Sequence, residues 1–533
     1  MEHDKIFPTL WSGDDAALTV RDCALSLLKA FGMTSIFGNP GSTELPMFRG
    51  FPEAFRYILG LQESVVVGMA DGYAQATGNA ALVNLHSAAG VGHALGNIFT
   101  AYKNQTPLVI TAGQQARSIL PYDPFLFAKD AASFPKPYVK WSCEPARAAD
   151  VPAAIARGYY LAMQPPRGPV FVSIPVDDWD QPCAPLAPRQ VSRVVRGDAA
   201  MLARVGTELA KSSRPVFVVG PQVARDEAWA EMVALAEMHQ AAVWVSPMSG
   251  RCSFPEDHPL FAGFLAADRE RIVETLAGHD VILACGAPVF SYHIEGFGPH
   301  IPAGATLFQL IDDPEIAAWT PVGSTVVTSL KSALADLLSG PVPHARKAPP
   351  PRRAPLALPP MLTDKFLLSR IAKLRPADSI IVEEAPSSRS PMHDYLPILR
   401  PNGFYTCASG GLGHGLPAAV GMALGRPAEK VIALLGDGSS MYSIQGLWTA
   451  AQLRLPIAFI IIRNGRYEAL HEFGRHFGLQ KTVGTTLPDL DFCALARGQG
   501  CDAIAVSRID QLDDALRAAF AASVPTLVEV EVV

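Results

Sequence analysis

The chain has 533 residues, of which 49% are hydrophobic and 18% are charged, and its formal net charge is −6. This composition is typical of a globular protein with several buried cores, and the length predicts three or four domains. Lysine and arginine form no long runs, so nothing indicates binding to nucleic acid or to an anionic membrane surface. The longest apolar runs have the length of strands and are far too short to cross a bilayer.

The first residues and the cysteines both bear on where the protein acts. Residues 1–15 are acidic and lack the basic-then-apolar pattern of a secretory signal. The eight cysteines are scattered and include no C-x-x-C pair, which favours reduced thiols over a disulfide framework or a zinc site. We therefore expect a cytoplasmic protein.

Short apolar runs alternate with helical patterns through the first 180 residues. Amphipathic segments at Ser64–Thr77 and Gly92–Asn104 separate some of these runs. Strands that alternate with helices predict a parallel sheet covered on both faces. The candidate strands are TSIFG (34–38), AALVNLHS (80–87), PLVITAG (107–113) and PVFVSIP (169–175).

The first of these strands ends in an unusual elbow, within IFGNPGSTELPMF at Ile36–Phe48. We expect Gly38 and Gly41 to permit a steep turn and Pro40 to stiffen it, so that the Ser42 hydroxyl is presented to solvent or to a ligand. The chain then restarts as if a helix began. The elbow is either a tight turn or the floor of a ligand site.

The same alternation predicts two more domains. It resumes from residue 215 and again after the proline-rich segment His344–Pro360, which we expect to be an extended linker. The fold class is therefore α/β, with three doubly wound parallel-sheet domains at 1–190, 191–343 and 361–533. The central domain carries no G-x-G-x-x-G sequence, so we expect no cofactor there. Its candidate strands are PVFVVG, AVWVSP and DVILACGAPVF, and those of the last domain are SIIVEEAP, KVIALLGDG, IAFIIIRN and TLVEVEVV.

A strand–helix–strand unit in the last domain predicts a metal and phosphate site. A strand ends at Gly436-Asp437-Gly438, helical periodicity covers Ser439–Leu455, and the next strand ends at Asn464. Asp437 and Asn464 are 27 residues apart and follow parallel strands, so they should meet at one edge of the sheet. Their oxygen atoms suit Mg²⁺ or Ca²⁺, and the following helix N-terminus suits an anion. Alone, G-D-G also fits a tight turn with a capping aspartate.

This unit resembles the thiamine diphosphate signature, which begins with GDG and ends in Asn after about this interval. The usual Asn-Asn pair is Arg463-Asn464 here. Further segments make nearly the whole chain, from about residue 20, similar to the benzoylformate decarboxylase family of thiamine diphosphate-dependent enzymes. These segments are NPGSTELP, NLHSAAGVGHALGN, VKWSCEPA, GPVFVSIPVDDWD, GAPVFSYH, GGLGHGLPAA and GDGSSMYSIQGLWTAAQ.

The resemblance implies a role for each matching residue. Glu63, which otherwise reads as an ordinary first-turn glutamate, would bind N1′ of the cofactor's aminopyrimidine and favour formation of the reactive ylide. Ser42 would bind the substrate carboxylate, His86 would exchange the proton on the substrate oxygen, and His293 would protonate the enamine after CO₂ leaves. Mg²⁺, or Ca²⁺, would be held by Asp437, Asn464 and the Arg466 carbonyl. The other implied cofactor contacts are Asn39, Pro40, Gly41, Gly410, Leu412, Gly438, Ser439 and Tyr467.

The substrate pocket is where the match weakens. A lining that resembles an aryl pocket would comprise Phe125, Leu126, Thr406, Ala469, Leu470 and Phe473. Thr406 stands where an aromatic residue is expected, and Pro386 replaces a small polar one. His414 and Glu468 are polar where the family pattern is apolar or small. Because a buried polar group needs a partner, these changes favour a substituted or more polar aryl 2-oxo acid, such as a hydroxylated one.

The resemblance implies non-oxidative decarboxylation of an aromatic 2-oxo acid to an aldehyde, as in aromatic (mandelate) catabolism. The two halves of the site would come from different subunits, which implies at least a homodimer, with a homotetramer common in such enzymes. One alternative is a carboligase or lyase that makes or splits 2-hydroxy ketones, or a decarboxylase of another 2-oxo acid. A second is a non-catalytic relative kept as a binding or regulatory subunit.

Overall fold

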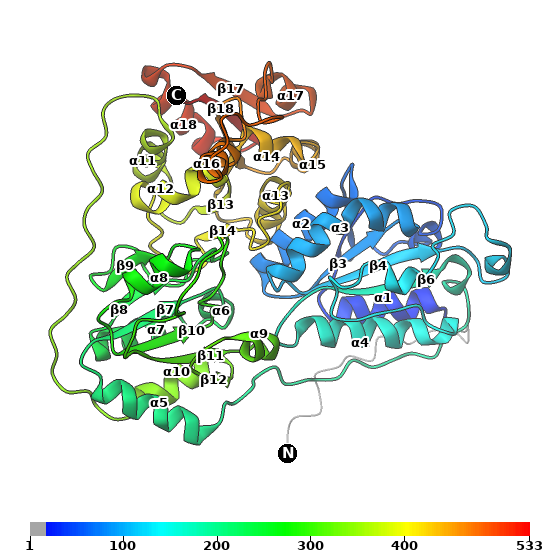
Figure 1. Cartoon of the computed structure of the whole chain (residues 1–533). Coiled ribbons are helices and arrows are strands. Elements are labelled where there is room, and N and C mark those ends of the chain that lie inside the picture. The colour runs from blue at the N-terminus through cyan, green and yellow to red at the C-terminus, as the bar shows by residue number, and fades with distance from the viewer. Residues whose placement is uncertain (1–17) are drawn as a thin grey trace.

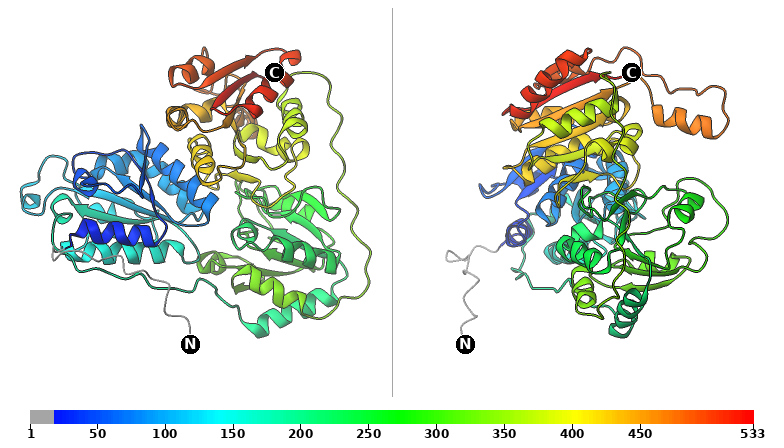
Figure 2. Two further views of the ribbon diagram at one scale, coloured as in Figure 1. Left: turned by 180° about the vertical axis from the view of Figure 1, so that it is seen from behind. Right: turned by 90° about the vertical axis from the view of Figure 1, so that its left-hand side faces the viewer.

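The computed structural model describes residues 18–533, and it contains three six-stranded sheets with helices on both faces (Figures 1 and 2). Paired strands within each sheet run parallel. This confirms the predicted fold class of three doubly wound α/β units. The pattern expected at residues 1–15 lies outside the described residues.

The N-terminal sheet has the strand order β2-β1-β3-β4-β6-β5. Its strands are β1 (Ser35–Gly38), β2 (Arg56–Leu59), β3 (Ala81–Leu85), β4 (Leu108–Gln114), β5 (Ser142–Cys143) and β6 (Val170–Pro175). Its helices are α1 (Val20–Ala30), α2 (Glu63–Thr77), α3 (Ser87–Lys103) and α4 (Val151–Met163). The expected strands of this domain are therefore confirmed.

The central sheet has the order β12-β11-β10-β7-β8-β9. Its strands are β7 (Pro215–Val219), β8 (Ala242–Val245), β9 (Phe261–Phe264), β10 (Val281–Cys285), β11 (Thr306–Ile311) and β12 (Ser324–Val327). The helices are α5 (Ala199–Lys211), α6 (Gln222–Arg225), α7 (Trp229–His239), α8 (Arg269–Thr275), α9 (Pro314–Trp319) and α10 (Leu330–Leu338).

The C-terminal sheet repeats this plan in the order β14-β13-β15-β16-β18-β17. Its strands are β13 (Ile380–Glu384), β14 (Phe404–Thr406), β15 (Val431–Gly436), β16 (Ile457–Arg463), β17 (Asp502–Val506) and β18 (Thr526–Glu531). The helices are α11 (Asp364–Leu374), α12 (Arg389–Tyr395), α13 (Gly415–Gly425), α14 (Asp437–Met441), α15 (Gly446–Gln452), α16 (Glu468–His476), α17 (Phe492–Gly498) and α18 (Ile509–Ala521).

The segment between α10 and α11 is extended and runs along the outside of the molecule (Figure 1). It includes the proline-rich residues 344–360. Between residues 18 and 533, no helix has the length and apolar character needed to cross a membrane.

Each N-terminal strand sends alternate side chains to two separate cores. Phe37 and Val83 pack beneath α2 and α3, whereas Ile36 and Leu82 pack against α1 and α4. Successive side chains of a strand point to opposite faces, so a run of consecutive apolar residues fills both cores. This is why these strands read as continuous apolar runs.

Helices α2 and α13 join the N-terminal and C-terminal domains into one continuous apolar core. The helices approach backbone to backbone at glycines. A Cβ atom on Gly72 would lie 2.1 Å from the Ala418 carbonyl oxygen, and one on Gly421 would lie 1.8 Å from that of Met69. A side chain at either position would therefore force the helices apart.

A buried ion pair crosses the same interface. His414 Nε2 lies 3.2 Å from Asp71 Oδ2, and both side chains are almost completely buried. Asp71 also accepts hydrogen bonds from Gln75, Asn104 and Thr106. Burial alone would raise the pKa of Asp71, but His414 and these donors hold it below its usual value. Burial alone would lower the pKa of His414, but Asp71 raises it.

Two helices differ from the predictions. The helix expected over Ser439–Leu455 is divided into α14 and α15, with a turn between them. Between them the backbone makes tighter bonds to the third preceding residue, from the Ser443 N–H to the Ser440 carbonyl (3.2 Å) and from the Gly446 N–H to the Ser443 carbonyl (3.0 Å), and α15 begins at Gly446. The helix expected from Gly92 instead begins at Ser87.

The elbow after β1 also differs in its cause. Neither Gly38 nor Gly41 has a positive φ, so neither glycine is required by a left-handed backbone conformation. A Cβ on Gly38 would lie 2.1 Å from the Tyr57 hydroxyl, and one on Gly41 would lie 2.1 Å from His86 Nδ1. These glycines make room for neighbouring side chains. The chain then forms a short 3-10 turn, η1 (Leu45–Phe48), in place of an α-helix.

The Asp71–His414 pair should make stability depend on pH. The lowered pKa of Asp71 adds stability above its ordinary 3.8, which is lost as pH falls through the lowered value. The raised pKa of His414 adds stability that is complete below its ordinary 6.5 and is lost as pH rises through the raised value. We expect His414→Leu to lower the free energy of unfolding by roughly 3–5 kcal/mol near pH 6, and by less at higher pH.

Urea unfolding of both proteins at several pH values between 5 and 9 measures this difference. His344→Gln, which changes an exposed histidine in the linker, is the matched control and should behave like the wild type at each pH. A destabilisation by His414→Leu near pH 6 that is no larger than that of His344→Gln would contradict the ion pair.

Candidate active site

Asp437 and Asn464 meet at the carboxyl edge of the C-terminal sheet, as their positions after parallel strands predicted. Asp437 Oδ2 accepts from the backbone N–H groups of Asn464 (3.0 Å) and Gly465 (2.7 Å). Asp437 Oδ1 accepts from the Gly438 N–H (2.7 Å). Three backbone donors therefore fix this carboxylate while leaving it at the end of two strands, where a cation could bind it.

The Arg466 backbone lies beside the same pair. Its N–H donates to Asn464 Oδ1 (3.1 Å), and its carbonyl accepts from the Glu468 N–H. The three residues expected to ligate a metal thus lie at the ends of two neighbouring strands, with Asp437 after β15 and with Asn464 and Arg466 in the turn after β16. Carboxylate, amide and carbonyl oxygens form a donor set that fits Mg²⁺, although their role as ligands remains a prediction.

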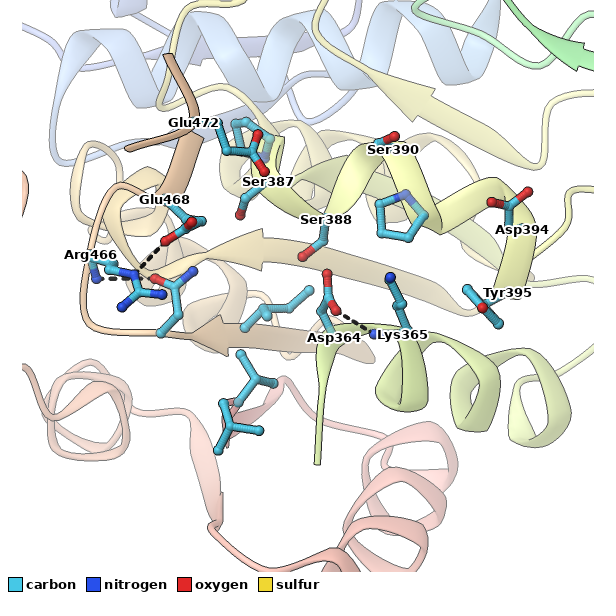
Figure 3. Close-up of a pocket in the computed structure, with 16 residues that line it drawn as sticks. Asp364, Lys365, Ser387, Ser388, Ser390, Asp394, Tyr395, Arg466, Glu468 and Glu472 are labelled. Carbon is cyan, nitrogen blue, oxygen red and sulfur yellow. Dashed lines mark hydrogen bonds and ion pairs between the residues drawn. The ribbon is translucent and has the colours of Figure 1, made fainter. Parts of the chain in front are cut away.

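A cavity of about 710 Å³ opens beside this turn (Figure 3). Arg466 and Glu468 lie at one end, and Asp394 and Tyr395 at the other. Its walls come from the segments 364–365, 386–395, 462–472 and 532–533, all in the C-terminal domain. Pro386, which the sequence analysis noted as unusual, lies in its wall.

Gly438, Ser439 and Tyr467 surround Asp437. A Cβ on Gly438 would lie 2.2 Å from the Tyr467 ring, so only glycine lets that ring cover the turn. Ser439 is buried in the first turn of α14. Burial, with Tyr442 and Asp437 nearby, raises the pKa of Tyr467. The cofactor contacts expected from these residues remain predictions.

The loop at residues 407–414 carries Gly410 and Leu412 and is held by a buried carboxylate. Glu384 accepts from the backbone N–H groups of Gly413 (2.6 Å), His414 (2.7 Å) and Gly415. Gly410 has a φ of +71°, which favours glycine, and it is exposed. The sequence analysis did not identify Glu384. The one sequence feature that could have pointed to it is an acidic residue at the end of a buried strand.

Thr406 lies behind this loop, away from the cavity lining. Its side chain is buried, and its hydroxyl accepts from Arg389 Nη2 (2.7 Å). Arg389 also pairs with Glu383 at 2.9 Å. The expected place of Thr406 in the substrate pocket remains a prediction. In this structure its hydroxyl already has a hydrogen-bond partner within the protein, Arg389.

Glu63 opens α2 just after β2, as predicted. Its side chain is 12% exposed and lies 3.1 Å from His93 Nδ1. The Asn39 amide donates to its other oxygen at 3.4 Å. The carboxyl group is therefore largely enclosed by polar neighbours of its own domain and lies at the carboxyl edge of that sheet. His93 is a further candidate that sequence reasoning missed.

His86 is held by a buried carboxylate that the sequence analysis also missed. Glu44 Oε2 lies 2.9 Å from His86 Nδ1, and the Glu44 side chain is only 1% exposed. Glu44 further accepts from the backbone N–H groups of Gly41 (2.8 Å) and Gly113 (2.9 Å) and from the Thr43 hydroxyl. A carboxylate acceptor at Nδ1 holds the proton there, which leaves Nε2 free to exchange a proton.

The elbow itself presents Ser42 outward. Pro40 and Ser42 are exposed, whereas Thr43 and Glu44 behind them are buried. The elbow thus separates a buried carboxylate from an exposed hydroxyl within three residues. Ser42 is accessible at the surface of this chain, and its carboxylate-binding role remains a prediction.

His293 lies near a residue expected in the aryl pocket. It follows β10 on an exposed segment, and its ring stacks on that of Phe473 in α16, with centroids 4.8 Å apart. The α16 segment, which also carries Ala469 and Leu470, projects from the body of the molecule (Figure 2, right). Leu470 is 50% exposed there.

Phe125 and Leu126 lie far from that group in the fold. They belong to the long connection between β4 and β5, which projects at the edge of the N-terminal domain (Figure 1). Phe125 is 87% exposed. One chain therefore does not bring these two residues together with Ala469, Leu470 and Phe473.

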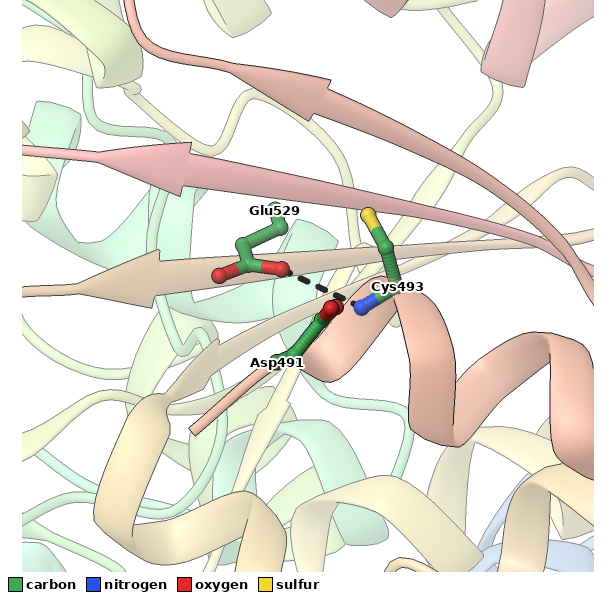
Figure 4. A group of neighbouring side chains, drawn as sticks. All are labelled: Asp491, Cys493 and Glu529. Carbon is green, nitrogen blue, oxygen red and sulfur yellow. Dashed lines mark hydrogen bonds between the residues drawn. The ribbon is translucent and has the colours of Figure 1, made fainter. Parts of the chain in front are cut away.

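Asp491, Cys493 and Glu529 form a second group with metal-binding side chains (Figure 4). Asp491 caps α17 by accepting from the Ala494 N–H, and Glu529 accepts from the Cys493 N–H and lies 3.4 Å from Arg463. Burial raises the pKa of the Cys493 thiol to about 11, which keeps it protonated at neutral pH. These contacts account for the group without a metal.

Each of the three domains matches a model of a known protein family. The family models for thiamine pyrophosphate enzymes match residues 18–130 (N-terminal TPP binding domain), 202–337 (central domain) and 387–530 (C-terminal TPP binding domain). A benzoylformate decarboxylase of Pseudomonas aeruginosa is 45% identical over 96% of this chain and 98% of its own length.

Two solved structures are similar over almost the full length. The benzoylformate decarboxylase of Polynucleobacter necessarius has a TM-score of 0.95 and 38% identity, covering 96% of this chain and 98% of its own. The thiamine diphosphate-dependent 4-hydroxybenzoylformate decarboxylase of Rhodococcus jostii has a TM-score of 0.93 and 40% identity, covering 97% and 99%.

Glu44 should act on turnover through His86. We expect Glu44→Gln to lower kcat by roughly 10- to 100-fold and to shift the pH profile of kcat, because the amide no longer holds the proton on Nδ1. Steady-state kinetics across pH measures both effects. Glu53→Gln, an exposed glutamate of the same domain, is the matched control. A reduced kcat with an unchanged pH profile would indicate a structural role only.

Proposed function

This chain belongs to the thiamine pyrophosphate enzyme family, and on that premise we propose that it is a carboxy-lyase that converts an aromatic 2-oxo acid to the aldehyde and CO₂. The observation that carries this proposal is the likeness to a benzoylformate decarboxylase over nearly the whole of both chains. Benzoylformate, or a ring-substituted analogue, is the proposed substrate, which would place the reaction in aromatic catabolism.

The residues at the C-terminal edge fit the diphosphate end of the cofactor. Asp437, Asn464 and the Arg466 carbonyl would hold Mg²⁺ or Ca²⁺, because all three offer oxygen atoms at the ends of the neighbouring strands β15 and β16. Gly410 and Leu412 would contact the cofactor rings from a loop that Glu384 fixes. When bound, thiamine diphosphate supplies the carbon nucleophile and the electron sink for loss of CO₂.

The residues at the N-terminal edge would handle protons and the substrate. Glu63 would hold a proton against the cofactor's pyrimidine, in a setting that is mostly shielded from water. His86, oriented by Glu44, would give a proton to the substrate oxygen through Nε2. Ser42 would bind the substrate carboxylate, and His293 would return a proton after CO₂ leaves. These assignments are supported by the positions of the side chains at the edges of their domains.

The structure removes part of the argument for a hydroxylated substrate. The expectation rested partly on His414 and Glu468 as polar groups in need of a partner in the pocket. His414 is paired with Asp71, and Glu468 lies beside Arg466 and Arg475, so neither needs a substrate hydroxyl. The remaining support for such a substrate is the likeness to the 4-hydroxybenzoylformate decarboxylase. The aryl ring would lie near Phe473 and Leu470, where apolar surroundings favour loss of the carboxylate.

We further propose that two subunits complete each active site. Residues of the N-terminal domain, such as Glu63, are absent from the lining of the cavity beside Asn464. Phe125, Leu470 and Phe477 are exposed on projecting segments, as expected for surfaces that a second subunit covers. A homodimer is the smallest assembly that meets this requirement, and a homotetramer is a pair of such dimers.

The eight cysteines are all unpaired, which supports the proposal that the protein acts in the reducing cytoplasm. Carboligation is a second candidate activity, because the same carbon nucleophile can attack an aldehyde. The separate carboxylate-binding and proton-transfer residues favour decarboxylation. A purely regulatory subunit would have no need of Glu63, His86 and Asp437 together.

A panel of 2-oxo acids tests the proposed reaction. With thiamine diphosphate and Mg²⁺, we expect benzoylformate or 4-hydroxybenzoylformate to yield CO₂ and aldehyde in equal amounts, and aliphatic 2-oxo acids to react more slowly. Glu63→Gln should lower kcat by roughly 100-fold or more while calorimetry still detects Mg²⁺-dependent binding of the cofactor. Absence of cofactor binding to the wild type, or an unchanged kcat in the variant, would overturn the assignment.

Mixed dimers test the shared active site. Glu63→Gln removes the pyrimidine partner and Asp437→Asn removes the metal ligand, so each variant alone should be nearly inactive. We expect the two variants, co-expressed with different affinity tags, to regain about a quarter of wild-type activity, because half of randomly formed dimers are mixed and one of their two sites is intact. No recovery in a purified mixed dimer would place both residues of a site on one chain.

A further inference from the structure

Four arginines meet in a cavity where the three domains join, away from the candidate active site. Arg167 comes from the N-terminal domain, Arg225 and Arg251 from the central domain, and Arg426 from the end of α13 in the C-terminal domain. We call this group the arginine junction. The cavity has a volume of about 140 Å³, and Glu227 is the acidic residue in its lining.

Arg251 has only neutral hydrogen-bond acceptors among the contacts of the described chain. Its guanidinium donates to Asn402 Oδ1 (2.7 Å) and makes longer contacts, both of 3.4 Å, with Gln75 Oε1 and the Tyr405 hydroxyl. It also lies 4.4 Å from the centre of the Tyr405 ring. Its Nε atom is buried and has no partner in residues 18–533. The carboxylate of Asp71 acts on Arg251 at longer range, with Gln75 between them, and no carboxylate in residues 18–533 hydrogen-bonds to the guanidinium. A largely enclosed cation without such a partner favours the binding of an anion.

The other three arginines are incompletely neutralised. Arg225 lies 3.8 Å from Asp312, and burial raises the pKa of that carboxyl to about 6. Arg426 lies 3.4 Å from Glu429, but Glu429 is also bound by Arg400.

Arg167 belongs to the same unbalanced group. Burial and the positive charges of Arg225 and Arg193 lower the pKa of Arg167, and the carboxylates of Asp226 and Asp312 offset only part of this shift. Like charges held this close repel one another unless a counter-charge lies between them.

We propose that the arginine junction binds a small oxyanion of the phosphate class. Guanidinium groups present planar pairs of N–H donors that match the oxygen atoms of phosphate. The cavity has room for about four or five water molecules, which suits a free phosphate or the terminal phosphate of a larger ligand. Because the arginines come from all three domains, a bound anion would fasten these domains to one another.

The site is connected to the loop at residues 407–414 by direct hydrogen bonds. Gln75 contacts Arg251 and donates to Asp71 (2.5 Å), which pairs with His414. Asn104 lines the cavity, and its Oδ1 accepts from the Ala408 N–H (2.8 Å). An anion at the junction would therefore stabilise the contacts that hold this loop.

Thermal unfolding of the desalted holoenzyme, titrated with inorganic phosphate at constant ionic strength, tests the proposal. Bound thiamine diphosphate keeps phosphate out of the cofactor site. We expect a saturable rise in Tm of roughly 2–4 °C, which sodium chloride does not reproduce. A parallel titration with ADP distinguishes the two sources of the anion. If the whole ligand must fit inside the cavity, free phosphate raises the Tm and ADP does not; if only a terminal phosphate must enter, both raise it.

Arg167→Gln and Arg251→Gln should each abolish the rise caused by phosphate. Arg167→Gln leaves the contacts of Arg251 with Asn402 and Tyr405 in place, so it tests the site even if Arg251→Gln unfolds. Arg271→Gln, an exposed arginine on α8, removes the same charge elsewhere and should respond like the wild type. An equal rise in wild type and Arg167→Gln, or no saturable rise in the wild type, would overturn the proposal.

Discussion

The close contact between α2 and α13 is the constraint on which the rest of the structure depends. Gly72 and Gly421 let the two backbones touch, and the resulting core runs without interruption from the N-terminal sheet to the C-terminal sheet. Glu63 is the first residue of α2, and α13 begins directly after the loop that carries Gly410 and Leu412. Packing these two helices therefore fixes both candidate site segments at once.

The same contact explains why one chain leaves its functional edges apart. Each sheet gathers its polar residues at the carboxyl ends of its strands, because parallel strands all end on one side. Glu63 and His86 lie at one such edge and Asp437 at another, while the helices that join the domains pack between the sheets. A second chain, placed against the projecting segments, is the simplest way for edges of the two kinds to face each other.

Strand ends could be predicted from the sequence, whereas side-chain partners could not. Asp437 and Asn464 lie together because parallel β15 and β16 dictate it, and apolar runs reveal such strands. Glu44 holds His86 through a contact spanning 42 residues of sequence, and no local pattern encodes that distance. The sequence predicts that Gly41 permits a steep turn, whereas in the structure its φ is not positive and the space beside it is filled by His86. The division between α14 and α15 likewise depends on turn-type backbone bonds, such as that from the Gly446 N–H to the Ser443 carbonyl, which no residue pattern revealed.

Buried polar groups, more than apolar ones, set the position of the loop at residues 407–414. An apolar interface tolerates small shifts of one helix along another, but a buried carboxylate loses several kcal/mol if its donors move away. Asp71 accepts from Gln75, Asn104 and Thr106 and pairs with His414, so its partners come from both domains that α2 and α13 join. Glu384 holds the backbone at the same end of the loop through three N–H groups. Two buried carboxylates thus hold the C-terminal end of this loop, Asp71 through the His414 side chain and Glu384 through the backbone.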